Sequence, residues 1–234
     1  MPLPQIMREV LQMGEEAMRR PVEIEFAVEI DAKNRSCVFY LLQIRPMVDV
    51  RTEVNIDLSA IDPARVLLRS DNALGHGNFD DLTDVVYVKT DDYSAGNNPL
   101  IAEEIECLNA GFLAEGRHYV LIGPGRWGSS DPWLGVPVKW PAISAARLIV
   151  EAGLTNYRVD PSQGTHFFQN LTSFGVGYFT INDYIGDGLY NRAALDVLPA
   201  VQETAHVSHV RFASPLSLKI DGRKKLGFLP LPQT

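Results

Sequence analysis

An alternation of large apolar residues with glutamates and one alanine between Val22 and Ile30 narrows the possible folds of this chain more than any other feature. The apolar side chains fall at every second position: Ile24, Phe26, Val28 and Ile30. Residues two apart in a strand share a face, so the pattern predicts a half-buried strand. Residues 31–36 are typical of a turn, and the β-rich run Cys37–Ile44 is expected to pair back as a hairpin. Pro46 ends that pairing because proline has no amide donor.

The rest of the chain divides into segments with different periodicities. Residues 6–19 are predicted to form an amphipathic helix before the hairpin, and a domain boundary is expected near residue 50, which gives domains 1–50 and 51–234. In the second domain a strand at 84–89, a helix at 99–114 and a strand at 118–122 predict a βαβ unit.

The helix of this unit is expected to start at Asn98 as its N-cap, with Pro99 at the first helical position. A second helix is expected at 141–152, with a strand at 155–159 after it. A short helix or turn is expected at 166–174, and further strands at 176–181, 206–212 and 216–220. Residues 47–83 have weaker periodicity and include the Gly- and Asn-rich segment 71–78. The predicted fold class is α/β or α+β.

Composition excludes several classes of function. The formal charge of −8, the pI near 5.1 and the absence of a long basic run argue against a nucleic-acid partner. Cys37 and Cys107 are the two cysteines, with no CxxC and no Cys/His cluster, so neither a disulfide framework nor a zinc site is predicted. No segment reaches the roughly 18 apolar residues of a membrane span. A cytoplasmic location, with no membrane partner, is expected.

The segment LIGPGRWGSS at 121–130 contains the spacing G-x-G-x-x-G. In a dinucleotide-binding loop the third glycine opens a helix, but here Pro132, Pro137 and Pro141 interrupt any helix until about residue 141. A nicotinamide-dependent dehydrogenase is therefore disfavoured. The loop can still bind a small anion through a nest of amides, a cation and two hydroxyl groups, which are supplied by Gly123, Gly125, Arg126, Gly128, Ser129 and Ser130.

Two other interpretations of this loop stay open. The glycines can simply permit a tight excursion of the chain while Trp127, Trp133 and Trp140 cover the core. Alternatively, residues 123–131 make the protein a non-catalytic binding or regulatory module for a small anion.

The hairpin carries a second polar set. Glu23 and Glu25 share a face of the first strand, and Gln43 and Arg45 share a face of the second, so all four side chains can converge. Carboxylate and amide oxygens can hold Mg²⁺ on the phosphates of ATP, and a guanidinium can stabilise a phosphoryl group in transfer. The alternative is a solvent-facing strand pair with an ordinary Glu–Arg contact, which would contribute little.

The motifs EIEF at 23–26 and LLQIRP at 41–46, after the helix that begins near residue 6, resemble the end of the ATP-binding domain of the phosphoenolpyruvate synthase and pyruvate phosphate dikinase family. The resemblance covers about residues 6–47. It implies the C-terminal helix and hairpin of an ATP-grasp domain, followed by a mixed α/β domain. It also implies that Glu25 and Gln43 bind Mg-ATP, with Glu25 as a magnesium ligand, Glu23 as a lesser contributor and Arg45 as the catalytic residue.

The function implied by the resemblance is phosphoryl transfer from Mg-ATP to a histidine, and then to pyruvate or a similar acceptor. The cofactors are Mg²⁺ and ATP, the latter as substrate. The partner is the N-terminal ATP-grasp portion of the same polypeptide, and without it this isolated chain is expected to be nearly inactive. Segments of residues 51–234 also resemble the region that follows the ATP-grasp portion in phosphoenolpyruvate synthase-like bacterial proteins.

Three histidines complete the candidates. His166 can be a phosphoryl acceptor or a general base, or a partly buried side chain beside Phe167 and Phe168. His206 and His209 lie close in sequence but lack further metal ligands nearby, so a metal site there is a minor alternative.

Overall fold

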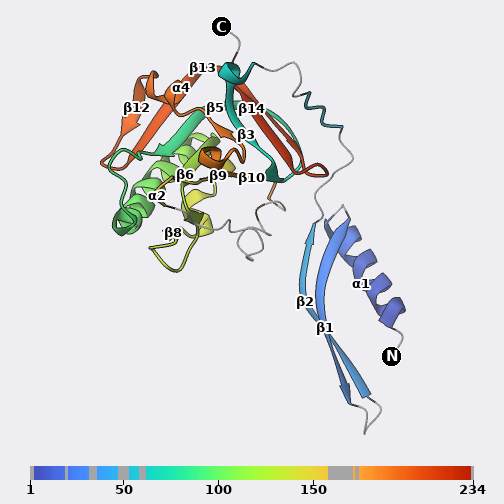
Figure 1. Cartoon of the computed structure of the whole chain (residues 1–234). Helices are drawn as coiled ribbons and strands as arrows, with labels where there is room; N and C mark the ends of the chain where they lie inside the picture. Colours follow the sequence, from blue (N-terminus) through green and yellow to red (C-terminus); the bar gives the residue numbers. More distant parts are fainter. Residues whose placement is uncertain are drawn as a thin grey trace. The chain divides into compact units, whose positions relative to one another are not determined.

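The computed structural model describes residues 3–18, 21–31, 36–46, 53–57, 62–157, 171 and 174–232. The chain forms two compact units, Met1–Asp49 and Val50–Thr234, each of which is described by itself (Figure 1). The class is mixed, with helices and many strands. No helix in the described ranges is long and apolar enough to cross a membrane.

The first unit is a helix packed on a hairpin, as predicted. Helix α1 (Leu3–Met18) covers an antiparallel pair formed by β1 (Val22–Asp31) and β2 (Ser36–Pro46). Gly14 is the buried residue of the helix, and a Cβ atom there would overlap the side chains of Ile44 and Val22. A glycine therefore lets the helix approach this face of the hairpin closely.

The second unit is built on one ten-stranded sheet with the order β11-β3-β14-β13-β5-β6-β9-β10-β4, and β12 pairs with β13. Neighbouring strands are parallel from β5 to β10, and the remaining pairs are antiparallel. The strands are β3 (Val66–Ser70), β4 (Asn72–Leu74), β5 (Gly77–Val88), β6 (Tyr119–Pro124), β9 (Ala146–Ala152), β10 (Gly177–Ile181), β11 (Leu189–Tyr190), β12 (Ala200–Glu203), β13 (Val207–Asp221) and β14 (Leu226–Pro230).

Short elements connect these strands. They are η1 (Pro63–Arg65), η2 (Ala95–Asn97), β7 (Arg126–Trp127), β8 (Gly135–Val136), η3 (Trp140–Ile143), η4 (Asp183–Ile185) and α4 (Ala193–Asp196). Strands β7 and β8 form a separate parallel pair.

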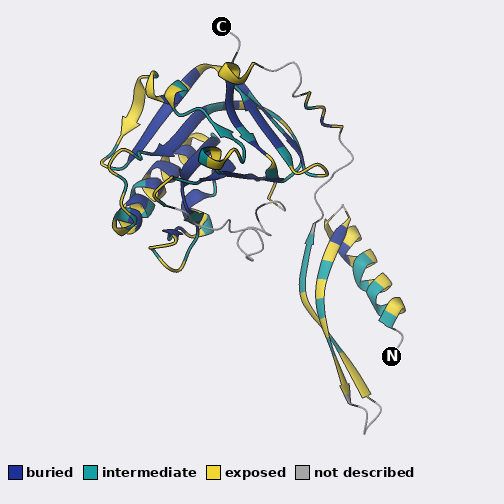
Figure 2. Ribbon diagram, in the orientation of Figure 1, coloured by how far each residue is buried: buried dark blue, intermediate teal, exposed yellow. Residues whose placement is uncertain are grey.

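The large sheet curls. Strands β3 and β4 follow each other in the chain but stand far apart in the strand order, and the Ala73 amide of β4 donates to the Lys225 carbonyl at the β13–β14 turn, 2.8 Å away. Side chains inside the curl, such as Val85, Val120 and Val150, form one core cluster. The outer face forms a second cluster under helix α2 (Asn98–Glu115), and the central strands are buried on both faces (Figure 2).

The predicted βαβ unit is confirmed, because α2 connects the parallel strands β5 and β6. One detail of the helix start was wrong: the N-cap is Asn97, and Asn98 is the first helical residue. The Asn98 side chain instead donates to the Pro132 carbonyl at 2.7 Å and accepts from the Tyr93 hydroxyl at 3.0 Å. The side chain of Asn98 is thus used to tie the helix to the loop before β8.

The predicted helix at 141–152 is wrong. Residues Trp140–Ile143 form a single 3₁₀ turn, and Ala146–Ala152 form the buried parallel strand β9. A strand buried on both faces is apolar at nearly every position, so its periodicity resembles that of a buried helix.

Two further expectations need revision. The predicted strands at 206–212 and 216–220 belong to one irregular strand, β13. Leu154 and Tyr157 form one isolated bridge where a strand at 155–159 was expected. Residues 158–159 and most of 166–174 lie outside the described ranges.

Candidate functional site

The register of the hairpin brings the four predicted site residues together. Glu23 stands opposite Arg45, and Glu25 stands opposite Gln43. Directly opposed residues of an antiparallel pair project to the same face. Val22 and its neighbours on the other face meet α1, so the polar set lies on the face away from the helix.

Arg45 is the most constrained member of the set. Its Nε atom forms an ion pair with Glu23 Oε1, and its side chain is 23% exposed. The Nη1 atom is buried and has no hydrogen-bond partner among the described residues. Because an unpaired buried donor is costly, an oxygen of a bound phosphate would stabilise this position.

The oxygen donors beside Arg45 fit a magnesium nucleotide. Glu25 offers a carboxylate and Gln43 an amide oxygen on adjacent strands, and Mg²⁺ usually takes one or two such protein ligands together with waters and phosphate oxygens. The described residues contain no cluster of three or more His, Cys, Asp or Glu side chains that could hold a metal alone.

The glycine-rich loop uses its donors to hold the fold. The amide of Arg126 donates to the Leu134 carbonyl at 3.1 Å, and that of Gly128 to the Val136 carbonyl at 2.9 Å. The amide of Trp127 donates to Glu151 Oε1 at 3.1 Å. Three amides of this loop, including that of Gly128 from the predicted anion nest, are thus occupied. Gly125 and Gly128 have φ angles of 69° and 73°, as a tight excursion requires.

The side chains of the glycine-rich loop also make contacts within the fold. Ser129 Oγ donates to the Asp131 carbonyl at 2.7 Å, whereas Ser130 is exposed. Trp127 is buried, and its Nε1 atom donates to the Val150 carbonyl at 2.9 Å. Trp133, however, is 68% exposed, so the expectation that it covers the core was wrong.

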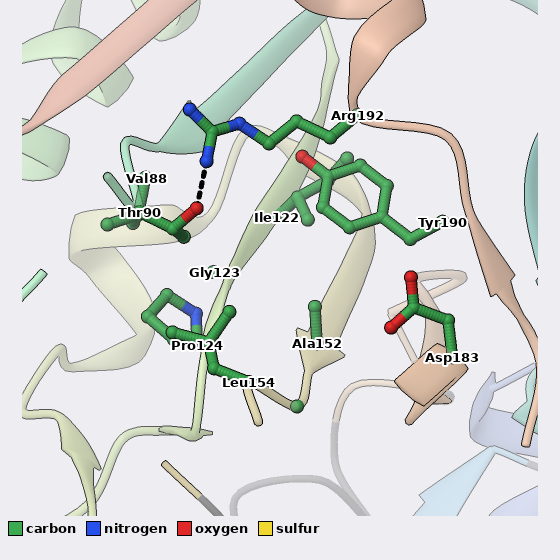
Figure 3. Close-up of a pocket in the computed structure, with 11 residues that line it drawn as sticks. Val88, Thr90, Ile122, Gly123, Pro124, Ala152, Leu154, Asp183, Tyr190 and Arg192 are labelled. Carbon is green, nitrogen blue, oxygen red and sulfur yellow. Dashed lines mark hydrogen bonds between the residues drawn. The ribbon is translucent and has the colours of Figure 1, made fainter. Parts of the chain in front are cut away.

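A cavity of about 140 Å³ lies where the parallel strands end. Val88, Ile122 and Ala152, from the last residues of β5, β6 and β9, line it together with Gly123 (Figure 3). Ligands commonly bind at the carboxyl ends of parallel strands. Of the residues predicted to form the anion loop, Gly123 lines this cavity. The others do not line it: Gly125, Arg126, Gly128, Ser129 and Ser130.

The polar wall of this cavity was not predicted from the sequence. Arg192 Nη1 donates to Thr90 Oγ1, and its Nη2 lies 2.6 Å from Asp91 Oδ2. Burial raises the pKa of Tyr190, which stands beside Arg192. About a hundred residues separate Arg192 from Thr90, so no local pattern could have indicated their contact.

His206 and His209, which were considered as a possible metal pair, contact different carboxylates. His206 Nδ1 lies 2.9 Å from Glu104 Oε1, and His209 Nε2 lies 2.7 Å from Asp84 Oδ1. Each ring therefore has its own carboxylate, and the two do not share a metal site among the described residues. His166 lies outside those residues.

Comparisons of the chain with protein-family models, with curated proteins and with solved structures found no match. The resemblance to the phosphoenolpyruvate synthase family consequently depends on the sequence segments of this chain, and its site residues depend on the hairpin motifs. The cavities of the second unit have to be interpreted from their own chemistry.

Proposed function

We propose that this chain is the C-terminal part of a phosphoenolpyruvate synthase-like, ATP-dependent phosphotransferase, and that α1, β1 and β2 are the closing helix and hairpin of its ATP-grasp domain. The observation that carries the proposal is the register that sets Glu23 opposite Arg45 and Glu25 opposite Gln43. The reaction is phosphoryl transfer from Mg-ATP to a histidine, and then to pyruvate or a similar acceptor.

Each residue of the set has a role in this proposal. Glu25 and Gln43 supply oxygen ligands to the magnesium ion that bridges the phosphates. Arg45 neutralises charge on the transferred group, and its buried Nη1 atom gains a phosphate oxygen as acceptor. Glu23 acts through Arg45, because their ion pair sets the direction of the guanidinium.

The apolar surface of the hairpin supports a further layer of protein. Ile30 is 71% exposed and Leu42 is 59% exposed, and Val38 and Leu41 are also exposed. An isolated two-stranded hairpin is at best marginally stable in water, so a covering layer would stabilise it. In this proposal the layer is the N-terminal ATP-grasp portion of the same polypeptide, which completes the nucleotide site.

The occupied amides of the glycine-rich loop count against the alternative of an anion-binding module. The φ angles and backbone hydrogen bonds of this loop are accounted for by its tight turn and its attachment to β8 and β9. We therefore do not propose this alternative.

The test uses the polypeptide in the form that its source cells contain. An antibody against the second unit first measures the mass of that form, and its Arg45→Ala variant is then compared with the wild type. With Mg-ATP, the variant should form acid-labile phosphoprotein about 10²- to 10³-fold more slowly, because a cation that stabilises transition-state charge is lost. Arg45→Lys should recover part of the rate.

Glu29→Gln is the matched control. Glu29 lies on the same strand and accepts a hydrogen bond from Tyr40 at 3.0 Å, but it stands away from the predicted site residues. This variant should keep the full rate. Full transfer by Arg45→Ala, with an unchanged melting temperature, would contradict the proposal.

A further inference from the structure

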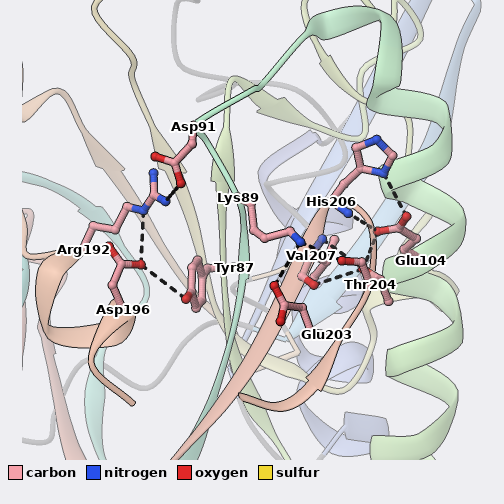
Figure 4. Close-up of polar contacts among 10 residues, drawn as sticks. All are labelled: Tyr87, Lys89, Asp91, Glu104, Arg192, Asp196, Glu203, Thr204, His206 and Val207. Atoms are coloured by element: carbon pink, nitrogen blue, oxygen red, sulfur yellow. Dashed lines mark hydrogen bonds and ion pairs between the residues drawn. The ribbon is translucent and has the colours of Figure 1, made fainter. Parts of the chain in front are cut away.

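The turn between β12 and β13 holds His206 rigidly. The ring Nδ1 atom lies 2.9 Å from Glu104 Oε1, and the His206 amide donates to Glu104 Oε2 at 3.1 Å. Thr204 Oγ1 donates to the same oxygen at 2.5 Å. From the other side, the Lys89 amide donates to the His206 carbonyl at 2.8 Å, and the Lys89 ammonium donates to the Thr204 carbonyl at 2.7 Å (Figure 4).

Glu104 fixes the tautomer of the His206 ring. Burial by itself raises the pKa of the Glu104 carboxyl, but hydrogen bonds from Thr204 and His206 outweigh it and hold the pKa below its usual value. The ionised carboxylate can only accept, so Nδ1 of the ring must be the donor. In the neutral form of the ring the lone pair is then on Nε2, which points away from Glu104 (Figure 4).

His206 lines a cavity of about 290 Å³ beside the end of β5, here called the His206 cavity. An apolar cavity of about 150 Å³ holds benzene, so this one has room for roughly a dozen non-hydrogen atoms. Its polar lining residues are Lys89, Asp91, Asp92, Tyr93, Ser94, Asn97 and His206.

The charges around the His206 cavity favour a cation. The Lys89 ammonium is paired with Glu203 Oε1 at 3.1 Å, and Asp91 is paired with Arg192 at 2.6 Å. Among the described residues this leaves the carboxylates of Asp92 and Glu104 beside the imidazole of His206, with no Lys or Arg partner of their own. An anionic ligand would meet net repulsion, whereas an ammonium group would be attracted.

We propose that the His206 cavity binds a small primary amine, whose ammonium group donates a hydrogen bond to His206 Nε2 while the surrounding carboxylates balance its charge. Because Glu104 fixes the ring tautomer, Nε2 of His206 is the hydrogen-bond acceptor. The excess carboxylates favour a positively charged ligand over a neutral or negative one. This site is separate from the hairpin residues, so the inference does not depend on the proposed phosphotransferase activity.

The test compares three ligands with the same four-carbon chain: 1,4-diaminobutane, 1,4-butanediol and succinate. The ring ¹⁵N resonances of His206 are followed while each is added to the full chain. The diamine should shift the Nε2 resonance in a saturable manner, and the diol should bind about tenfold more weakly because it lacks the charge. Succinate should cause no shift. Equal binding of the diol or succinate, or no saturable shift with the diamine, would overturn the proposal.

Two variants separate binding from folding. His206→Ala keeps the backbone bonds of the turn, so it should lose diamine binding and keep its melting temperature. Because this variant has no ring resonance at position 206, diamine binding by the wild type and all variants is compared by titration calorimetry. Glu104→Gln presents an amide that can donate to the ring, which allows the other tautomer and should weaken binding. His118→Ala is the control, because His118 is bonded to Ala145 and Arg147 and does not line the cavity. Unchanged binding by His206→Ala would sink the inference.

Discussion

Asp84→Asn is the substitution with the largest expected effect on stability. Asp84 lies on β5 and is 1% exposed. Its Oδ1 atom lies 2.7 Å from His209 Nε2 and 2.8 Å from Arg211 Nε, and its Oδ2 atom accepts from Thr83 at 2.7 Å and from Arg117. Asparagine has the same size, but it removes the charge and turns one acceptor into a donor that would face other donors.

The magnitude follows from these contacts. A hydrogen bond that involves a charged group contributes about 1.5–3 kcal/mol, and removal of one partner from a buried ion pair costs about 3–5 kcal/mol. The side chains of Arg117 and Arg211 are 29% and 42% exposed, so both can turn partly toward water and reduce the loss. We expect a loss of about 3 kcal/mol in the free energy of unfolding. With an m-value of about 2 kcal/mol/M, the urea midpoint falls by about 1.5 M.

The pH dependence checks the physical cause. Burial by itself raises the pKa of Asp84, but the hydrogen bonds from His209, Arg211 and Thr83 outweigh it and hold the pKa well below its usual range. A lowered folded-state pKa gives stability above the unfolded value, near 3.9, that is lost as the pH falls through the folded value. The difference between wild type and variant should therefore be full at pH 7 and shrink below about pH 4.

Urea unfolding at both pH values measures this difference. Asp80→Asn is the control, because Asp80 is an exposed residue of the same strand and accepts a hydrogen bond from Ser217. That variant should stay within about 0.5 kcal/mol of wild type. A similarly small loss for Asp84→Asn at pH 7, or a difference that grows on acidification, would refute the reasoning.

Three smaller changes give further predictions. Gly123→Ala places a Cβ atom into the buried ring of Trp127, so we expect the free energy of unfolding to fall by about 1–3 kcal/mol and the Trp fluorescence to change. Thermal unfolding measures the loss, and an unaltered melting temperature would count against it. Gly111→Ala, in an open position of α2, should instead stabilise by about 0.5–1 kcal/mol, and a lower melting temperature would contradict this. Tyr178→Phe removes a 2.6 Å hydrogen bond to the buried Glu151, and urea unfolding should show a loss of about 1–3 kcal/mol rather than no change.

The sequence pattern predicted the elements that bury one face and leave the other partly exposed. The strand at Val22–Asp31 alternates because α1 covers one face, and α2 was recognisable from its proline start and its apolar positions. The strand at Ala146–Ala152 lacks such a difference, because both of its faces are buried between the two core clusters. Its sequence therefore carried no period that separates strand from helix.

The same limit applies to the sites. The hairpin set was predictable because residues two apart in a strand share a face, which groups Glu23 with Glu25 and Gln43 with Arg45. The exact pairing of Glu25 with Gln43 depends on a register shift next to Phe26, which the sequence pattern did not indicate. The contacts of His206 with Glu104 and of Arg192 with Asp91 join residues about a hundred positions apart. Those contacts depend on the strand order of the curled sheet, which no short segment of sequence specifies.

The segment that follows β5 links both cavities of the second unit. Lys89 fixes the turn that carries His206, while Thr90 and Asp91 hold Arg192 at the smaller cavity. Asp91 lines the His206 cavity and neutralises Arg192 at the same time. A cation bound in the His206 cavity would compete with Arg192 for this carboxylate. Binding of an amine at one cavity should consequently change the charge at the other, and the Arg192 guanidinium resonances should shift together with those of His206.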